Sequence, residues 1–305
     1  MPTAEQLCRT RCRRVARAMW LYVGLPYLAV TLIFFALQRQ LIYRPSAAAD
    51  LSVAACRLPA DAVQDVRLEA QDGVTLKGWL LRARGRPQAG KSPLVLYFPG
   101  NAGHRFGRLS DLQEFAAAGW DVLIFDYRGY GDSGGSPAES ALESDAQQIW
   151  QYARNSLGYD EQRIVVFGES LGGAVALSLW KPDREDAAVP QPTALMLNST
   201  FTTMPEVVAW HYPWFPFRWL LWDRWPSAER IPRVTVLTMI FHGTDDEFVP
   251  FAQGQRLASL AAKGRFVKVE GGVHNSIPLG QVRRELEQLF PQQADVEQVA
   301  PTVVE

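Results

Sequence analysis

The feature that most restricts the fold is an alternation of short apolar segments with helix-length segments between residues 63 and 290. The later segments are apolar at almost every position, which is typical of strands buried on both faces of a parallel sheet. The first two flank Asp72 and Gly73, a pair that predicts an antiparallel hairpin. The expected strands are residues 63–68, 74–81, 94–98, 122–125, 164–167, 194–197, 236–241 and 266–269. This pattern predicts an α/β fold with a mostly parallel eight-stranded sheet, the hairpin at one edge and helices on both faces.

The first 45 residues differ from the rest of the chain. Five arginines, the last of them Arg17, precede an uncharged run at residues 18–37. Twenty helical residues at about 1.5 Å each span roughly 30 Å, the thickness of the hydrocarbon core of a bilayer. Gly24 and Pro26 lie within the run and are tolerated in lipid. We therefore expect one N-terminal transmembrane helix.

A cleaved signal peptide and a buried helix of the soluble domain are the alternatives for this run. The run is longer than the apolar part of a typical signal peptide, and residues 35–39 lack a small-x-small cleavage site. The clustered arginines do not suit a buried helix. More arginines precede the run than follow it, where Arg39 and Arg44 stand, so we expect a cytoplasmic N-terminus and an exported remainder. Cys56 is then alone on the exported side, and the working prediction is a bacterial inner-membrane protein facing the periplasm.

A candidate nucleophile follows the expected strand at 164–167. Gly168-Glu169-Ser170-Leu171-Gly172 fits G-x-S-x-G and opens an apolar helix, which is the strand–turn–helix context of a nucleophile elbow. There the backbone N–H of Leu171 would point at a developing oxyanion. A second match at residues 131–135 contains Ser133, but its strand ends several residues earlier and no helix begins there. The one histidine upstream of it, His104, is too near for a double-barrel protease, so we interpret Ser133 as a turn residue.

A serine nucleophile needs a base, and the base needs an acid to orient it. Among the four histidines, only His274 has acidic candidates at strand ends between it and Ser170, in the order nucleophile, acid, base. His242 ends a strand before the acid and is interpreted as a loop-packing residue, and His211 as a packing or membrane contact. The two acid candidates are Asp245 and Asp246; spacing to the following Val-Pro pair favours Asp246 and leaves Asp245 open.

The loop at residues 99–104 follows the third expected strand and is the place for a second oxyanion donor, the backbone N–H of Asn101. No set of residues has metal-ligand spacing, and acyl transfer through a serine needs no cofactor, so neither a metal nor a cofactor is expected. The formal net charge of −1 gives no reason to expect a nucleic-acid partner. The oligomeric state stays open.

These motifs together resemble the α/β-hydrolase superfamily, and more narrowly its membrane-anchored subgroup of protein depalmitoylases and uncharacterised bacterial relatives. The residues that carry the resemblance are Gly-Asn-Ala-Gly at 100–103, Asp-Tyr-Arg-Gly-Tyr-Gly at 126–131, Gly168–Gly173, Phe-Thr-Thr at 201–203 and His-Gly-Thr-Asp-Asp at 242–246. The resemblance implies the α/β-hydrolase fold and a Ser170, Asp246 and His274 triad. It also implies that Asp126 and Arg128 brace the loop beside the nucleophile. Pro99 stands where relatives usually carry histidine, which should matter little because the implied donor is a backbone N–H.

Five of the ten tryptophans lie between residues 210 and 225, after the sixth expected strand, where this superfamily inserts caps. Pro213 and Pro216 exclude one continuous helix. The segment is either a cap packed on the core or an aromatic surface that meets the bilayer or an acyl chain. The expected substrate or membrane contacts are Trp210, Trp214, Trp219 and Trp222.

The predicted protein is a membrane-anchored serine hydrolase that cleaves an ester or thioester of a lipid-like or acylated substrate. A serine peptidase of the same fold and a non-catalytic membrane scaffold are the alternatives. The expected parts of the chain are a basic cytoplasmic N-terminus (1–17), the transmembrane anchor (18–37), a linker (38–62), the catalytic domain (63–290) with a tryptophan-rich cap (205–232), and a disordered tail (291–305).

Overall fold

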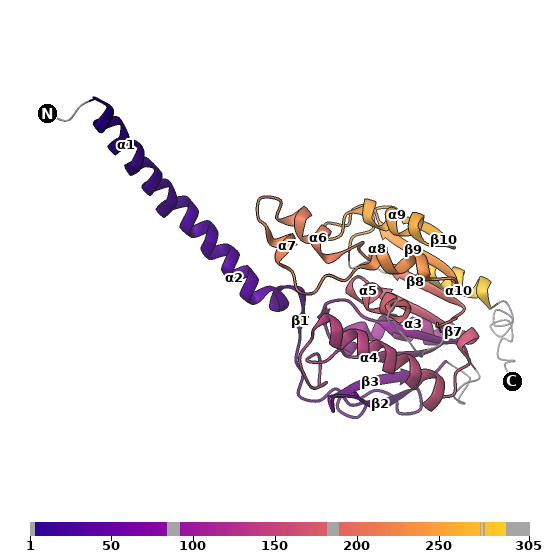
Figure 1. Cartoon of the computed structure of the whole chain (residues 1–305). Helices are drawn as coiled ribbons and strands as arrows, with labels where there is room; N and C mark the ends of the chain where they lie inside the picture. The colour runs from indigo at the N-terminus through magenta and orange to yellow at the C-terminus, as the bar shows by residue number, and fades with distance from the viewer. Residues whose placement is uncertain (1–3, 84–91, 182–188, 275, 277, 291–305) are drawn as a thin grey trace, which may run out of the picture.

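The computed structural model describes residues 4–83, 92–181, 189–274, 276 and 278–290. A long N-terminal helix projects from an α/β domain (Figure 1). The tail expected to be disordered, residues 291–305, lies outside the described residues.

An eight-stranded sheet forms the centre of the domain, in the order β10-β9-β8-β7-β4-β6-β3-β2. Its strands are β2 (Val63–Glu69), β3 (Thr75–Leu81), β4 (Leu94–Phe98), β6 (Asp121–Phe125), β7 (Ile164–Glu169), β8 (Ala194–Asn198), β9 (Leu237–Gly243) and β10 (Gly264–Val269). The pairs β2–β3 and β3–β6 are antiparallel and the rest are parallel. The mostly parallel sheet with a hairpin at its edge is therefore confirmed.

Two very short strands lie outside the main sheet. β1 (Arg44–Pro45) pairs in parallel with β5 (Ala102–Gly103), so the chain just after the N-terminal helix joins the loop that follows β4. A two-residue pairing has no hydrophobic period, and the sequence did not predict it.

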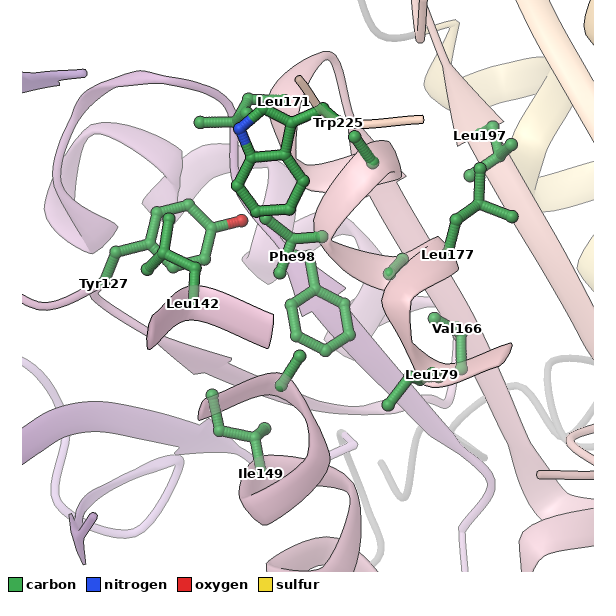
Figure 2. Close-up of a cluster of buried hydrophobic side chains, with 14 of the residues drawn as sticks. Phe98, Tyr127, Leu142, Ile149, Val166, Leu171, Leu177, Leu179, Leu197 and Trp225 are labelled. Atoms are coloured by element: carbon green, nitrogen blue, oxygen red, sulfur yellow. The ribbon is translucent and has the colours of Figure 1, made fainter. Parts of the chain in front are cut away.

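Helices cover both faces of the sheet, as expected. α3 (Leu109–Ala117) and α10 (Leu279–Leu289) pack on the face to which Val95 and Phe167 point. α4 (Glu139–Gln151), α5 (Leu171–Leu177) and α9 (Phe251–Leu260) pack on the opposite face. Figure 2 shows part of this second layer, where Phe98 and Val166 of the sheet meet side chains of α4 and α5. Successive residues of each strand point to opposite faces, so continuously apolar strands fill two cores at once.

Several short helical turns connect these elements. They are a π-helical turn at Tyr152–Ser156 and 3₁₀ turns at Arg105–Arg108, Glu161–Arg163, Ser178–Trp180 and Ile231–Arg233.

The N-terminal helix is built from α1 (Ala4–Met19), a π-helical turn (Trp20–Gly24) and α2 (Leu25–Ile42). Pro26 has no N–H to donate, and the preceding N–H of Leu25 bonds to the carbonyl of Trp20 five residues back, which widens the helix locally. Within the described chain, one helix, Arg9–Ile42, is long and apolar enough to cross a membrane. It continues five residues beyond the uncharged run at 18–37.

The segment between β8 and β9 forms a cap of three short helices, α6 (Met204–His211), α7 (Phe217–Leu220) and α8 (Ser227–Arg230). Thr203 begins α6 by accepting the N–H of Glu206 with its hydroxyl. The interruption between α6 and α7 contains Pro213 and Pro216. α7 lies against the second half of α2, where Phe217 stacks on Phe34 with ring centroids 3.8 Å apart (Figure 1).

Candidate active site

Ser170 sits in a sharp turn between β7 and α5, with φ +53° and ψ −115°. Non-glycine residues rarely adopt this conformation, which costs of order 1–3 kcal/mol and recurs at functional sites. The flanking glycines are required by close backbone contacts. A Cβ on Gly168 would lie 2.5 Å from the Cα of Gly173, and one on Gly172 would lie 2.0 Å from the carbonyl oxygen of Phe98. The turn is thus held by packing against the end of β4.

A hydrogen-bonded line joins Ser170, His274 and Asp246, which come from three different strand ends. Ser170 Oγ lies 2.9 Å from His274 Nε2, and His274 Nδ1 lies 3.0 and 2.9 Å from the two carboxylate oxygens of Asp246. Asp246 also accepts the N–H groups of Phe248 and Val249 at 3.0 and 2.8 Å. The structure therefore brings together the serine, acid and base named from the sequence, over separations of 28 and 104 residues.

The two acid candidates occupy different places. Asp245 accepts the hydroxyl of Thr244 at 3.0 Å, away from the histidine, whereas the Asp246 carboxylate is fully buried. Burial raises the pKa of Asp246, but hydrogen bonds from His242 and His274 and the N–H of Val249 outweigh it and hold the pKa well below its usual range. Asp246 is consequently ionised at neutral pH and can stabilise a protonated imidazole.

His242 lies beside the acid. Its Nε2 is 3.3 Å from Asp246 Oδ2 and 3.0 Å from the carbonyl oxygen of Val249. A Cβ on Gly254 would lie 2.4 Å from His242 Nδ1, so α9 approaches the ring closely. The sequence pattern indicated loop packing for His242 and not its contact with Asp246, although the four-residue spacing between them was a usable signal.

The loop proposed to carry the second oxyanion donor is tied to the end of the N-terminal helix. The side-chain amide of Asn101 donates to the carbonyl of Ile42 at 2.9 Å. The carbonyl of Asn101 accepts the N–H of Arg44 at 3.0 Å and the hydroxyl of Tyr130 at 2.9 Å. The N–H of Leu171 belongs to the first turn of α5, where helices leave their N–H groups without an intrahelical acceptor. The sequence did not predict these tethers.

Glu169, next to Ser170, contacts the same loop. It accepts hydrogen bonds from Arg108 at 2.7 and 3.0 Å and from the hydroxyl of Tyr97 at 3.0 Å. A Cβ on Gly100 would lie 3.4 Å from the Glu169 carboxylate, so loop and carboxylate are in contact. A charged residue inside an otherwise apolar strand–turn–helix was the signal for this brace.

Asp126 and Arg128, both expected to brace the loop beside the nucleophile, differ in what they hold. Asp126 accepts the backbone N–H of Arg105 at 2.6 Å and its guanidinium at 2.5 Å, which holds the turn after the Asn101 loop. Arg128 instead binds Asp145 of α4 and Asp72 of the β2–β3 turn. Arg128 therefore has a structural role, as expected, and it ties the loop after β6 to α4 and to the hairpin.

Ser133 of the second G-x-S-x-G match lies in the loop after β6. Its hydroxyl accepts the N–H of Lys77 at 2.9 Å and donates to the carbonyl of Asp126 at 3.0 Å. This hydroxyl is therefore engaged in holding the loop. Within the described residues, no group of three or more His, Cys, Asp or Glu side chains could hold a metal ion.

The cap reaches the site through the loop that carries Asp246. The ring of Phe248 packs against His274 with centroids 5.3 Å apart, and His211 at the end of α6 bonds to the carbonyl of Phe248 at 2.9 Å. Trp225 is fully buried, and its indole N–H donates to the hydroxyl of Tyr43. The four tryptophans expected to contact substrate or membrane, Trp210, Trp214, Trp219 and Trp222, are all exposed, Trp214 by 86% and Trp219 by 71%.

A family model described as serine aminopeptidase, S33, matches residues 91–228. The uncharacterised protein Rv2307c of Mycobacterium tuberculosis is 40% identical over 266 residues, which are 87% of this chain and 89% of that protein. Protein bem46 of Schizosaccharomyces pombe is 33% identical over 275 residues, which cover 85% and 88% of the two chains.

Two further similarities cover less of the sequence or concern the fold alone. The lysophosphatidylserine lipase ABHD12 of Danio rerio is 36% identical over 188 residues, which are 57% of this chain and 48% of that longer protein. The esterase Pf2001 of Pyrococcus furiosus superposes with a TM-score of 0.61 at 16% identity, covering 82% of this chain and 98% of the esterase.

Proposed function

Because this chain is a hydrolase of the α/β-hydrolase superfamily, we propose that it is a membrane-anchored serine hydrolase that acts through Ser170, His274 and Asp246. The proposed bond is the carboxylic ester or thioester of a hydrophobic acyl group. The observation that carries the proposal is the unbroken hydrogen-bonded line from Ser170 Oγ through the imidazole to a buried, ionised carboxylate.

In the proposed mechanism, Ser170 Oγ attacks the acyl carbonyl while His274 Nε2 takes its proton. His274 then gives that proton to the leaving alcohol or thiol, and water hydrolyses the acyl-enzyme by the same route. Asp246 holds the imidazole in orientation and stabilises its charged form. The backbone N–H groups of Leu171 and Asn101 are proposed to bind the oxyanion; removing one such donor typically lowers kcat by about 10²–10³-fold.

A fluorophosphonate probe tests the nucleophile. We expect the full-length protein in detergent or nanodiscs to be labelled, and Ser170→Ala to lose both labelling and ester hydrolysis. Ser133→Ala is the matched control, since it changes the serine of the other G-x-S-x-G sequence, and it should keep labelling. Absence of labelling in a folded wild-type protein would contradict the hydrolase mechanism and favour a non-catalytic scaffold.

The acyl substrate is supported by the exposed aromatic cap and by the similarity to ABHD12, a lysophosphatidylserine lipase. A series of p-nitrophenyl esters from acetate to palmitate, with a lysophospholipid and an acyl thioester alongside, defines the preference. Replacing Trp214 and Trp219 by Ser should lower long-chain turnover much more than acetate turnover. Equal losses for all chain lengths would contradict a role of these tryptophans in acyl recognition.

A serine peptidase is the second candidate, because the family model that matches residues 91–228 is named for an aminopeptidase. Aminoacyl p-nitroanilides compared with the ester series separate the two activities. We expect ester turnover to dominate by at least two orders of magnitude in kcat/KM. Preferential anilide hydrolysis that is lost in Ser170→Ala would reverse the assignment.

The anchor is proposed to be the uncharged run at 18–37 within α1 and α2, with the arginine-rich end in the cytoplasm and the catalytic domain exported. The bilayer is then a permanent partner of the protein. With this proposed orientation, the triad lies on the exported side of the membrane.

A further inference from the structure

The cap tip, residues 212–222, lies along the second half of α2. Phe215 stacks on Tyr27 with ring centroids 5.0 Å apart, and the hydroxyl of Tyr27 donates to the carbonyl of Trp214 at 3.0 Å. Phe217 stacks on Phe34 two turns further along α2. The cap tip therefore follows the helix over several turns.

The far end of this contact lies where the uncharged run ends. The side chain of Gln38 is fully buried, donates to the carbonyl of Leu220 at 3.2 Å and accepts the N–H of Trp222 at 2.7 Å. The guanidinium of Arg39 donates two hydrogen bonds to the carboxylate of Asp223, at 3.0 and 3.1 Å. A charged pair suits the border between hydrocarbon and headgroups, so this pair marks the membrane surface on the side of the domain.

The depth of the cap tip follows from helix geometry. From Arg39 back to Tyr27 there are 12 residues of α2, about 18 Å at 1.5 Å per residue, while the hydrocarbon core is about 30 Å thick. Arg17 at the other end of the uncharged run bounds the span on the opposite side. Residues that touch Tyr27 thus lie near the middle of the span. We propose that the cap tip is inserted into the same bilayer leaflet as the second half of α2, an inference that rests on the proposed anchor.

The backbone of the cap tip suits hydrocarbon, where unpaired polar groups are costly. Pro213 and Pro216 have no N–H. Of the nine other N–H groups in residues 212–222, at least four have acceptors within the protein: those of Tyr212, Phe215, Trp219 and Trp222 bond to Val208 O, Tyr212 O, Pro216 O and Gln38 Oε1. The carbonyls of Trp214 and Leu220 are taken by side chains of α2. An irregular segment at membrane depth needs this kind of internal pairing.

The side chains of the cap tip also suit lipid. Between residues 207 and 222 the chain has no Asp or Glu, and the one Lys or Arg is Arg218. The guanidinium of Arg218 lies 5.5 Å from the ring centroid of Trp219, and its long side chain can extend toward the headgroups. Tyr212, Trp214 and Trp219 are half or more exposed, a surface that the leaflet would cover.

Insertion would bring the triad to the leaflet. His211, directly before the cap tip, bonds to the carbonyl of Phe248, whose ring packs on His274. An acyl lipid could then reach Ser170 from the leaflet without its chain crossing water. The ligand of this surface is the lipid of one leaflet, and the catalytic domain is attached to the membrane at two places.

The test uses the full-length protein in nanodiscs of phosphatidylcholine and phosphatidylglycerol. Single spin labels are placed by Trp214→Cys and Trp219→Cys after Cys8, Cys12 and Cys56 are changed to Ser. Val30→Cys reports on α2, and Leu260→Cys, at the partly exposed end of α9, is the aqueous control. Accessibility to oxygen and to a water-soluble nickel chelate is then compared at each site.

We expect the labels at 30 and 214 to be several-fold more accessible to oxygen than to nickel, the label at 219 to be shallower, and the label at 260 to be aqueous. A label at 214 as open to nickel as the one at 260, with position 30 protected, would overturn the insertion and leave the anchor standing. A label at 30 that is also aqueous would overturn both. If the Trp214→Cys protein does not fold, a second measurement uses Trp214→Phe in the otherwise unaltered chain and lipids brominated deep in their acyl chains. These lipids should quench less tryptophan fluorescence in Trp214→Phe than in the wild type. Unchanged quenching would overturn the insertion.

Discussion

The backbone of Ser170 shows how neighbouring contacts hold a strained residue. The amide of Ser170 donates to the carbonyl of Asn198 at 2.8 Å, and Gly168 and Gly172 let the chain turn against β4 without a clash. The backbone strain at Ser170, of order 1–3 kcal/mol, is offset by the packing of the α5 layer. A side chain held in this way reaches His274 without rearrangement, which is the preorganisation that the proposed proton transfer needs.

The first residue-scale prediction concerns the acid. Asp246→Asn should lower kcat by about 10³–10⁴-fold, because an amide cannot hold the imidazole in the tautomer that accepts the serine proton. Asp245→Asn is the matched control, because the Asp245 carboxylate accepts the hydroxyl of the neighbouring Thr244. In this variant kcat should stay within about twofold of the wild-type value. Steady-state kinetics on one ester measures kcat for both variants. Equal losses of kcat would contradict the assignment of Asp246 as the acid.

The second prediction for a single residue is for Asp132, which accepts hydrogen bonds from Arg105 at 2.7 Å and from the N–H of Leu51 at 3.1 Å. Burial raises its pKa, but these bonds outweigh it and lower the pKa to about 2. Because the pKa is lower in the folded than in the unfolded protein, ionised Asp132 stabilises the fold at pH values above the unfolded pKa of 3.8. This stabilisation is lost as the pH falls toward 2. Because solvent screens part of the shift, Asp132→Asn should lower the free energy of unfolding by about 1–2 kcal/mol at pH 6.

Denaturant unfolding of the wild type and Asp132→Asn between pH 6 and pH 3 measures this effect. The difference between the two proteins should shrink steadily below pH 4. A difference that is constant over the range would mean that Asp132 acts through its shape and not through its charge.

At the scale of elements, the contact between α2 and the cap tip depends on one buried amide. Gln38 serves both the carbonyl of Leu220 and the N–H of Trp222 in a region that excludes water. An apolar replacement leaves these two backbone groups buried without a partner, which costs about 1–3 kcal/mol for each such group. The cap and the helix are therefore expected to open together when this amide is lost.

Gln38→Leu should speed hydrogen exchange of the Trp222 amide by about 5–150-fold, the equivalent of 1–3 kcal/mol of local opening free energy. Gln40→Leu is the matched control, because Gln40 is exposed two residues further along the same helix and should leave this exchange unchanged. Exchange measured by mass spectrometry in nanodiscs reports both variants. Protection of the cap that survives Gln38→Leu would show that the stacked aromatic rings alone hold the contact.

At the scale of the whole molecule, the long N-terminal helix and the hydrolase domain share two sets of contacts. The loop of Asn101 is bonded to Ile42 and Arg44, directly after α2, and the cap tip packs on α2 itself. The orientation of the domain relative to the helix is therefore set by packing and hydrogen bonds, not by a free linker. The chain expected as a linker at 38–62 begins with residues of α2 that carry these contacts.

The orientation in the membrane is the prediction at this scale. Cys12 is exposed and Cys56 is half-buried, on opposite sides of the proposed span. Two variants, each with a single cysteine, are treated with a membrane-impermeant maleimide in intact cells. The Cys8→Ser, Cys12→Ser protein should be labelled at Cys56. The Cys8→Ser, Cys56→Ser protein should stay unlabelled at Cys12 until the membrane is opened. The reverse pattern would place the domain in the cytoplasm.

Local sequence was sufficient for the sheet, the edge hairpin and the long apolar helix, and for naming Ser170 and His274 as partners. Strand and helix periods are written into neighbouring residues, and a nucleophile elbow lies within five consecutive positions. Contacts between distant segments settled the rest. They selected Asp246 over its neighbour, gave Arg128 partners in α4 and the hairpin, and buried Trp225 while exposing four other tryptophans of the cap. They also placed the cap tip along α2, some 180 residues away in sequence. Such choices depend on which surfaces meet after folding, and a one-dimensional pattern does not contain that information.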